Sequence, residues 1–244
     1  MILLFSGGVD SYVAWYYLGK PKTVYFNVQS RYSRRELGVV KRLIPDTIID
    51  NSLNFSDREV GDKAYIPFRN LILACQAVKY SDKVVIAGLK DDNVSDKNQQ
   101  VFYKFSDMLT EIEGRSIIVS SPFWDKTKEE VVRWYLSAVG NQEELLQTFS
   151  CYAPDEKHYS NVQTPPLGCG KCPACFRKWV ALMRNGIDDM EFNNKDLALE
   201  YYSAAREGKY EPSRNEAIIK TVEESGWVNE TILKSVHEGE TVET

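Results

Sequence analysis

Residues 2–11 of this 244-residue chain read I-L-L-F-S-G-G-V-D-S and give the clearest indication of its fold. Residues 2–5 are consecutively apolar, as in a short strand that is buried on both of its faces. Two glycines and a serine follow closely, and a helical period runs through residues 11–18. A buried strand, a glycine-rich turn and a helix in this order predict the beginning of a parallel α/β sheet.

The same alternation continues along the chain. Apolar runs at residues 23–28, 47–49, 83–87 and 116–120 have the length of strands, and residues 34–43, 70–80 and 101–111 have the spacing of crossover helices. We therefore expect an α/β fold, with an open, parallel, five-stranded, Rossmann-like sheet and helices on both faces. Residues 126–138 and 143–148 are also predicted to be helical and to lead out of the sheet.

Two domains are expected, an α/β nucleotide-binding domain at residues 1–145 and a cysteine-rich loop with a helical C-terminal region at residues 146–244. Residues 155–170 contain adjacent prolines, Pro165 and Pro166, and show no periodicity, which is typical of an irregular loop. Helical patterns follow at residues 172–185, 195–206, 215–224 and 229–236.

The charge balance limits the possible partners. The chain has 30 basic and 35 acidic residues, a net charge of −5, so it lacks the basic excess that neutralises many phosphates and argues against a nucleic-acid partner. It has no run of about 20 apolar residues that could span a bilayer. Its first residues show no basic stretch ahead of an apolar signal segment, and we expect a soluble, cytoplasmic protein without a membrane partner.

The loop after the first strand has the composition of a phosphate-binding site. Gly7 and Gly8 let the backbone approach an anion, and the helix that follows presents free N–H groups and the positive end of its dipole. It is not a Walker A loop, because the G-x-x-x-x-G-K-[ST] pattern is absent. The alternative is an ordinary strand-to-helix turn that is capped by Asp10 or Ser11.

The segment S-G-G-V-D-S at residues 6–11 resembles the signature of the PP-loop ATP pyrophosphatase superfamily. This resemblance implies that ATP is split into AMP and pyrophosphate. It also implies that Ser6, Gly7, Gly8 and Ser11 bind the pyrophosphate, and that Asp10 orders the loop or engages Mg²⁺. Hydroxyl and amide groups suit this role, because they can neutralise a leaving pyrophosphate without reorganising.

Four of the five cysteines, Cys151, Cys169, Cys172 and Cys175, lie in one stretch of the chain. Four thiolates at this spacing favour a closed, tetrahedral, structural zinc site. The alternatives are an iron–sulfur cluster, which the same ligands could hold, and unligated thiols. Cys75 stands apart in an apolar segment and is expected to be a buried core residue.

Further motifs, together covering about residues 1–186, are similar to the 7-cyano-7-deazaguanine synthases, the zinc-containing PP-loop family of the queuosine pathway. They are the segment from Phe26 to Leu37 with Arg31, I-P-F-R-N at residues 66–70, S-P at 121–122 with K-E-E-V at 128–131, T-F-S-C-Y at 148–152, and the cysteines from 169 to 175. The resemblance implies an adenine nucleotide alpha hydrolase-like fold and the cofactors ATP, Mg²⁺ and Zn²⁺. It also suggests a homodimer.

The resemblance implies a reaction and places residues in it. ATP activates the carboxylate of 7-carboxy-7-deazaguanine as an acyl-adenylate, ammonia gives an amide, and a second activation dehydrates the amide to a nitrile. Arg69, Lys128 and Asp10 are the candidate catalytic residues, with the two cations near the α-phosphate. Phe26, Arg31, Asn70 and Gly88 join the loop residues as candidates for binding the cofactor. The alternatives are that Asn70 only caps a helix and that Lys128 lies on a solvated helix face.

One segment departs from the family pattern. Residues 88–100 read G-L-K-D-D-N-V-S-D-K-N-Q-Q, where the family has roughly G-x-N-x-x-D-x-S-G-Y-P-D-C-R. Asn93 replaces the aspartate, and an amide in place of a carboxylate alters the hydrogen bonds offered to a purine-like edge. The sequence therefore leaves open a diverged amide-forming ligase that transfers an adenylated carboxylate to an amine of a protein, a nucleic acid or a small molecule. A non-catalytic nucleotide-binding interaction module is a third hypothesis.

Overall fold

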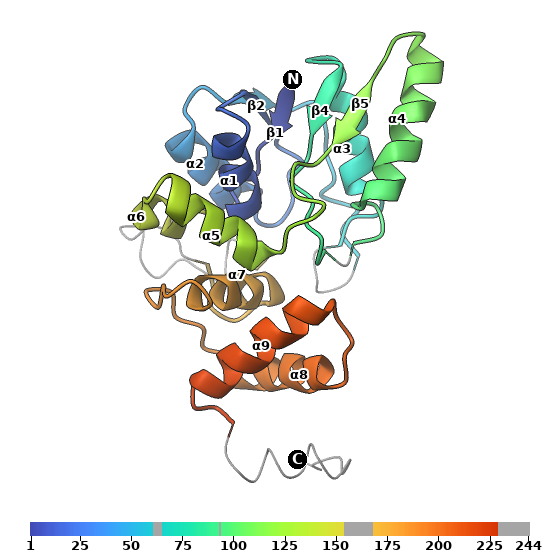
Figure 1. Ribbon diagram of the computed structural model, residues 1–244. Helices are drawn as coiled ribbons and strands as arrows, with labels where there is room; N and C mark the ends of the chain where they lie inside the picture. The colour runs from blue at the N-terminus through green and yellow to red at the C-terminus, as the bar shows by residue number, and fades with distance from the viewer. Residues whose placement is uncertain (61–64, 93, 154–167, 229–244) are drawn as a thin grey trace. The chain divides into compact units, whose positions relative to one another are not determined.

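The computed structural model describes residues 1–60, 65–92, 94–153 and 168–228. The chain divides into two compact units, Met1–Cys169 and Gly170–Thr244. The first unit contains a parallel five-stranded sheet of order β3-β2-β1-β4-β5 (Figure 1). Its strands are β1 (Ile2–Leu4), β2 (Lys22–Phe26), β3 (Ile48–Asp50), β4 (Lys83–Val85) and β5 (Ile118–Ser120). Each predicted apolar run overlaps one of these strands, and the predicted fold class is confirmed.

Helices cover both faces of the sheet, as Figure 1 shows. On one face lie α1 (Val9–Tyr17) and α2 (Ser33–Leu43), and on the other lie α3 (Arg69–Ala77) and α4 (Gln99–Glu113). The chain changes face because it runs outward from β1 to β3 and then returns to β4 on the other side of β1, and crossovers between parallel strands are in general right-handed. After β5, α5 (Lys128–Ala138) packs against α1, and α6 (Gln142–Leu146) follows.

The core explains why the strand sequences are almost continuously apolar. Ile2 and Leu4 of β1 belong to a buried cluster that also includes Ala74 of α3 and Phe102 of α4. Leu3, between the two, is also fully buried, on the opposite face of the strand. Because β1 is covered on both faces, none of its positions favours a polar residue.

A partly buried carboxylate joins the helices on the α1 face. Glu144 of α6 accepts hydrogen bonds from the hydroxyl groups of Tyr12, Tyr16 and Tyr135, the second at 3.0 Å and the third at 3.2 Å. Burial acts to raise the pKa of Glu144, but these three donors bring it below its ordinary value. The ionised carboxylate is therefore part of the packing between α1, α5 and α6.

The second unit consists of α7 (Pro173–Met183), α8 (Lys195–Arg206) and α9 (Pro212–Glu224) within its described part. Aromatic rings pack between them, and Trp179 of α7 stacks with Phe192 at a centroid distance of 5.5 Å and with Trp227 at 5.3 Å. Three predicted helices of this region are confirmed. The fourth, at residues 229–236, and most of the predicted loop at 155–170 lie outside the described residues.

One core prediction is wrong, because Cys75 is exposed. Its neighbours Ala74, Ala77 and Val78 point into the core instead. Successive residues of a helix are rotated by about 100°, so the face that buries residue 74 turns residue 75 outward.

None of the helices in the described part of the chain combines the length and apolar character needed to cross a membrane.

Candidate functional site

The glycine-rich loop lies at the topological switch point of the sheet. β1 has β2 on one side and β4 on the other, and the chain leaves β1 towards β2 but returns through β4. Ligands of open α/β sheets bind outside the carboxyl ends of the strands at this point. The loops after β1, β2 and β4 all begin at this edge, and they contain the predicted site residues Ser6, Gly7, Gly8, Arg31 and Gly88.

A hydrogen-bond network shapes the loop from Ser6 to Ser11. The hydroxyl of Ser11 accepts from the Ser6 amide at 3.3 Å and donates to the Gly8 carbonyl at 3.1 Å. The Gly8 amide donates to the Ser6 hydroxyl at 3.4 Å. Gly7 has a φ of +72°, and a Cβ there would lie 3.1 Å from a methyl group of Val39. The loop thus requires glycine for its conformation and its packing, and it holds two hydroxyl groups beside the start of α1.

Lys128 lies at the start of α5, and its ammonium group contacts the carboxylate of Asp10. A capping box between Thr127 and Glu130 holds this end of the helix. Lys128 is only 5% exposed, so the alternative of a solvated helix face is wrong. The structure brings together two of the three predicted catalytic residues, Asp10 and Lys128, across 118 residues of sequence.

A second ion pair lies in the loop after β4 and was not predicted. The Nζ atom of Lys97 is 2.5 Å from a carboxylate oxygen of Asp92, whose side chain is 1% exposed. Burial acts to lower the pKa of Lys97, but the charges of Asp92 and Asp10 raise it above its ordinary value. The site therefore contains a second ammonium group within the field of Asp10. The sequence signal for it was weak: charged residues in a loop that directly follows a buried strand.

Arg69, the third predicted catalytic residue, lies at the start of α3. Its Nη1 atom donates to the hydroxyl of Tyr32 at 2.6 Å, and the ring of Tyr32 packs against that of Tyr152 at a centroid distance of 5.3 Å. Burial acts to lower the pKa of Arg69, but the two tyrosines and Glu36 raise it. Arg69 is thus a charged group that tyrosine hydroxyls orient beside the loop after β2.

Asn70 links α3 to the loop after β4. Its backbone and side-chain nitrogen atoms each donate to the carboxylate of Asp96 at 2.9 Å. The N-cap of α3 is Phe68 rather than Asn70, and it makes no side-chain cap hydrogen bond. The alternative that Asn70 only caps the helix is therefore wrong. Asn93, where the sequence departs from the family pattern, lies outside the described residues.

Three other predicted binding residues have structural partners of their own. The backbone amide of Arg31 donates to Glu59 at 2.9 Å, and its guanidinium contacts the same carboxylate. Phe26 is buried in the core cluster, so its ring is directed into the protein. A Cβ on Gly88 would lie 2.3 Å from the ring of Trp124, which gives a packing reason for glycine at this position.

The segment that leads to the first cysteine lies against the glycine-rich loop. The backbone amide of Phe149 donates to the carbonyl of Gly7 at 2.8 Å. A Cβ on Gly8 would lie 3.4 Å from the Phe149 carbonyl and 3.6 Å from the hydroxyl of Ser150. The loop and the residues just before Cys151 therefore form one packed unit.

The four predicted zinc ligands, Cys151, Cys169, Cys172 and Cys175, form a cluster in which all sulfur atoms lie within 4.8 Å of one another. In a tetrahedral site with Zn–S bonds of about 2.3 Å, the sulfur atoms are about 3.8 Å apart. Cys151 and Cys175 are buried. The donor set and its spacing fit a structural zinc ion, and the cluster could bind one.

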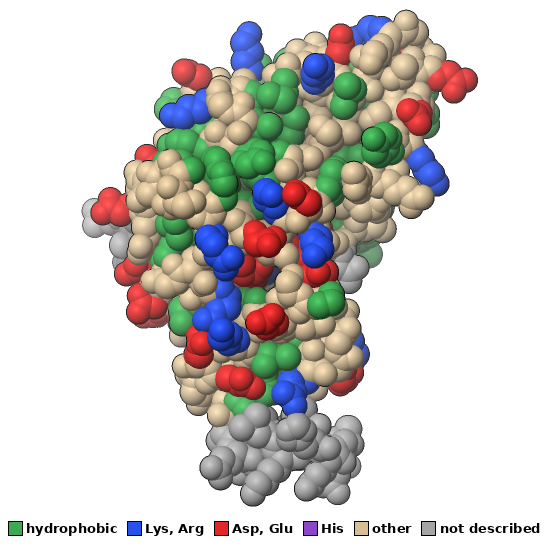
Figure 2. Space-filling model, viewed as in Figure 1, with side chains coloured by type: hydrophobic (Ala, Val, Ile, Leu, Met, Phe, Trp, Pro, Cys, Tyr) green, Lys and Arg blue, Asp and Glu red, His purple; other side chains and the backbone are tan. Residues whose placement is uncertain are grey.

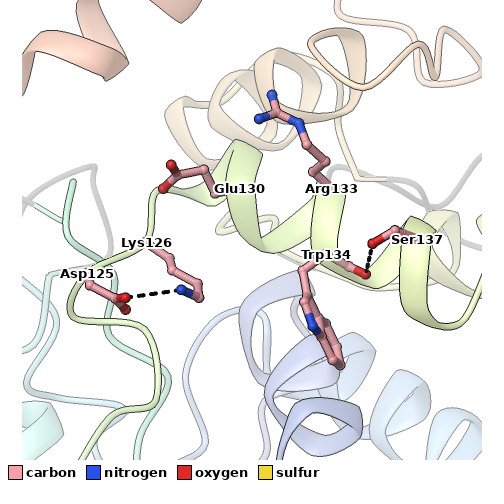
Figure 3. A pocket seen from close by; sticks show the side chains of 6 residues that line it. All are labelled: Asp125, Lys126, Glu130, Arg133, Trp134 and Ser137. Carbon is pink, nitrogen blue, oxygen red and sulfur yellow. Dashed lines mark hydrogen bonds and ion pairs between the residues drawn. The ribbon is translucent and has the colours of Figure 1, made fainter.

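A shallow pocket of about 450 Å³ lies on α5 and the loop before it (Figure 3). Its lining side chains are those of Asp125, Lys126, Glu130, Arg133, Trp134 and Ser137, and none of them is a predicted site residue. Acidic and basic side chains intermingle on the face of the protein that Figure 2 shows.

Comparison with known proteins gives a family match. The model of the family described as "Queuosine biosynthesis protein QueC" matches residues 38–186. This span extends from α2 through the cysteine cluster into the residues that follow α7.

Curated relatives agree with this match. A 7-cyano-7-deazaguanine synthase of Methanocaldococcus jannaschii is 26% identical, and the alignment covers 77% of this chain and 96% of the relative. The synthase of Archaeoglobus fulgidus is 27% identical, with 85% of this chain and 98% of the relative covered. That of Chlorobium phaeobacteroides is 24% identical, with 77% of this chain and 94% of the relative covered.

Proposed function

Because the chain belongs to the QueC family of queuosine biosynthesis proteins, we propose that it uses ATP and ammonia to convert 7-carboxy-7-deazaguanine into 7-cyano-7-deazaguanine. The curated relatives are named for this product. The enzyme would be an ATP-dependent ligase that forms a carbon–nitrogen bond and releases AMP and pyrophosphate.

The reaction requires two activations by ATP. A carboxylate oxygen attacks the α-phosphorus and releases pyrophosphate, and ammonia then displaces AMP to give the amide. The amide oxygen attacks the α-phosphorus of a second ATP and releases a second pyrophosphate, and loss of AMP and two protons leaves the nitrile. Each step needs cations where negative charge accumulates and a rigid cradle for the leaving pyrophosphate, rather than a protein nucleophile.

The single observation that carries the proposal is the loop at the switch point. Its Ser6 and Ser11 hydroxyls and the start of α1 suit a pyrophosphate group. We propose that Lys128 and Arg69 neutralise charge at the α-phosphate and that Lys97 assists them from the loop after β4. Asp10 would then hold Lys128 in place and take part in binding Mg²⁺ with the nucleotide.

The zinc ion would have a structural role. Four thiolates leave it no open coordination position, so it would supply folding energy rather than chemistry. Cys151 follows directly on the segment that packs against Gly7. Zinc bound here would therefore hold this segment against the pyrophosphate loop.

The test is incubation of the protein with ATP, Mg²⁺, 7-carboxy-7-deazaguanine and ammonium, with the products identified by mass spectrometry. Nitrile, AMP and pyrophosphate are expected. Ser11→Ala should lower the rate of pyrophosphate release at least tenfold, since it removes one positioned donor. Ser137→Ala removes a hydroxyl that bonds only locally on α5 and serves as the matched control. Failure of the parent to bind ATP would refute the proposal.

The altered loop after β4 favours a second candidate. In this chain Asp96 is bound to Asn70 and Lys97 is paired with Asp92, in the segment where the Y-P-D-C-R element of the family is missing. An amide-forming ligase would stop after one activation and transfer the acyl group to an amine of a protein, a nucleic acid or a small molecule. Amide or adenylate without nitrile in the same assay would identify it.

Two further proposals concern assembly and binding alone. We propose a homodimer, which sedimentation equilibrium would test by a mass of twice the 28.0 kDa of one chain. A non-catalytic nucleotide-binding module is the remaining hypothesis, and it would bind ATP without releasing pyrophosphate under any of these conditions.

A further inference from the structure

Phe68 combines two features that a surface phenylalanine rarely has together. Its φ angle is +56°, in the left-handed region, where a Cβ crowds the backbone and a bulky residue is an outlier. The residue is also 65% exposed. Its ring therefore gains little burial that could offset the strain, and the fold alone does not explain why this position is not glycine.

The residues that follow Phe68 place it at the switch point. Arg69 is bound to Tyr32, in the loop after β2, and Asn70 is bound to Asp96, in the loop after β4. β2 and β4 flank β1, which leads into the pyrophosphate loop. The chain at residues 69 and 70 is thus anchored on both sides of the loop, and Phe68 immediately precedes this anchor.

We propose that Phe68 is a stacking platform for the planar heterocycle that enters the switch point. An aromatic ring offers a flat π face to any purine-like base, and such stacking needs no specific hydrogen bonds. Strained backbone conformations persist where the surroundings hold them for a functional purpose. The inference rests on the proposed function, whose two substrates, ATP and a deazapurine carboxylate, both carry a ring of this class.

Two variants separate the strain from the ring. Phe68→Gly removes both, and we expect it to raise the Tm by about 2 °C because glycine adopts positive φ without a steric penalty. Phe68→Leu removes the ring but keeps the Cβ, and its Tm should stay within about 1 °C of the parent. An unchanged or lower Tm for Phe68→Gly would show that the conformation is not strained and would overturn the premise.

Binding is measured by titration calorimetry, with Mg²⁺-ATP and with 7-carboxy-7-deazaguanine separately. Both variants should raise the dissociation constant for one of these ligands about tenfold, and Phe68→Trp should retain parental binding. The ligand whose dissociation constant rises carries the heterocycle that stacks on Phe68. Tyr103→Leu, at an exposed ring of α4, is the matched control and should change neither constant.

Parental binding of both ligands by Phe68→Gly and Phe68→Leu would overturn the proposal, as would a parent that binds neither. The readout is independent of turnover. A parent that binds its ligands but never releases pyrophosphate would contradict the proposed function and would still show whether Phe68 contributes to binding.

Discussion

Replacing Lys128 by Met should lower both the stability and the activity of the protein, by amounts that follow from its contact with Asp10. Lys128 is 5% exposed, whereas the side chain of Asp10 is 21% exposed. A hydrogen bond between charged groups contributes about 1.5–3 kcal/mol, and removal of one partner from a fully buried pair costs about 3–5 kcal/mol. Because water can still reach Asp10, we expect a loss of about 2 kcal/mol.

Urea titration and thermal unfolding measure this loss. For a domain of this size, about 2 kcal/mol corresponds to a fall in Tm of about 6 °C. Lys126→Met is the matched control, because Lys126 pairs with its neighbour Asp125 at 3.1 Å in the open pocket of Figure 3. A surface pair of this kind contributes little, so the control should stay within about 0.5 kcal/mol of the parent.

A double-mutant cycle with Asp10→Asn tests whether the two residues interact. In contacting residues the loss in the double variant differs from the sum of the single losses by about 0.5–3 kcal/mol. Additive losses would refute the pairing. Pyrophosphate release should fall about a hundredfold in Lys128→Met, as expected for the loss of one group that stabilises developing charge, and should be parental in Lys126→Met. A parental rate in Lys128→Met would refute the catalytic role.

Three other substitutions test individual features of the structure. Gly88→Ala would push a Cβ into Trp124 and should destabilise the protein by about 1–3 kcal/mol in urea titrations, with Gly38→Ala, where nothing lies within 4 Å, as the control. Glu144 has a lowered pKa when folded, so the parent should lose stability as the pH falls below the ordinary glutamate value. Glu144→Gln should be less stable at pH 7, and its stability should change less than that of the parent across this acid range. Thermal unfolding at a series of pH values would show both effects. Cys151→Ser should lower the zinc content measured by mass spectrometry and the Tm together; an unchanged Tm after zinc loss would contradict the structural role.

Much of the fold could be predicted because local patterns carry it. Strands that are covered on both faces are continuously apolar, and the helices between them repeat with a helical period, so the sheet and its order of elements can be read along the chain. The S-G-G-x-D-S loop and the four cysteines are similarly local, since each motif keeps its residues close in sequence. These features required no knowledge of which segments meet.

The environment of single side chains was predicted less well. Cys75 is apolar enough for a core, yet the rotation of α3 turns it outward. The sequence pattern around Lys128 was also consistent with a solvated face of a helix. Only the packing of α5 on α1 shows that this side chain is buried. Burial depends on the neighbours of a helix, and the sequence of the helix alone does not contain them.

Hydrophobic period and short-range spacing encode the α/β sheet, the glycine-rich loop and the cysteine set, so these features follow from the amino-acid sequence alone. The folded chain was needed to show that Lys128 pairs with Asp10, that Lys97 adds a charge within the field of Asp10, and that Phe68 is held in a left-handed conformation. These features arise where loops from separate strands converge at one edge of the sheet. Electrostatic and steric effects act over distances in space, and residues that are far apart in the chain become neighbours only when it folds.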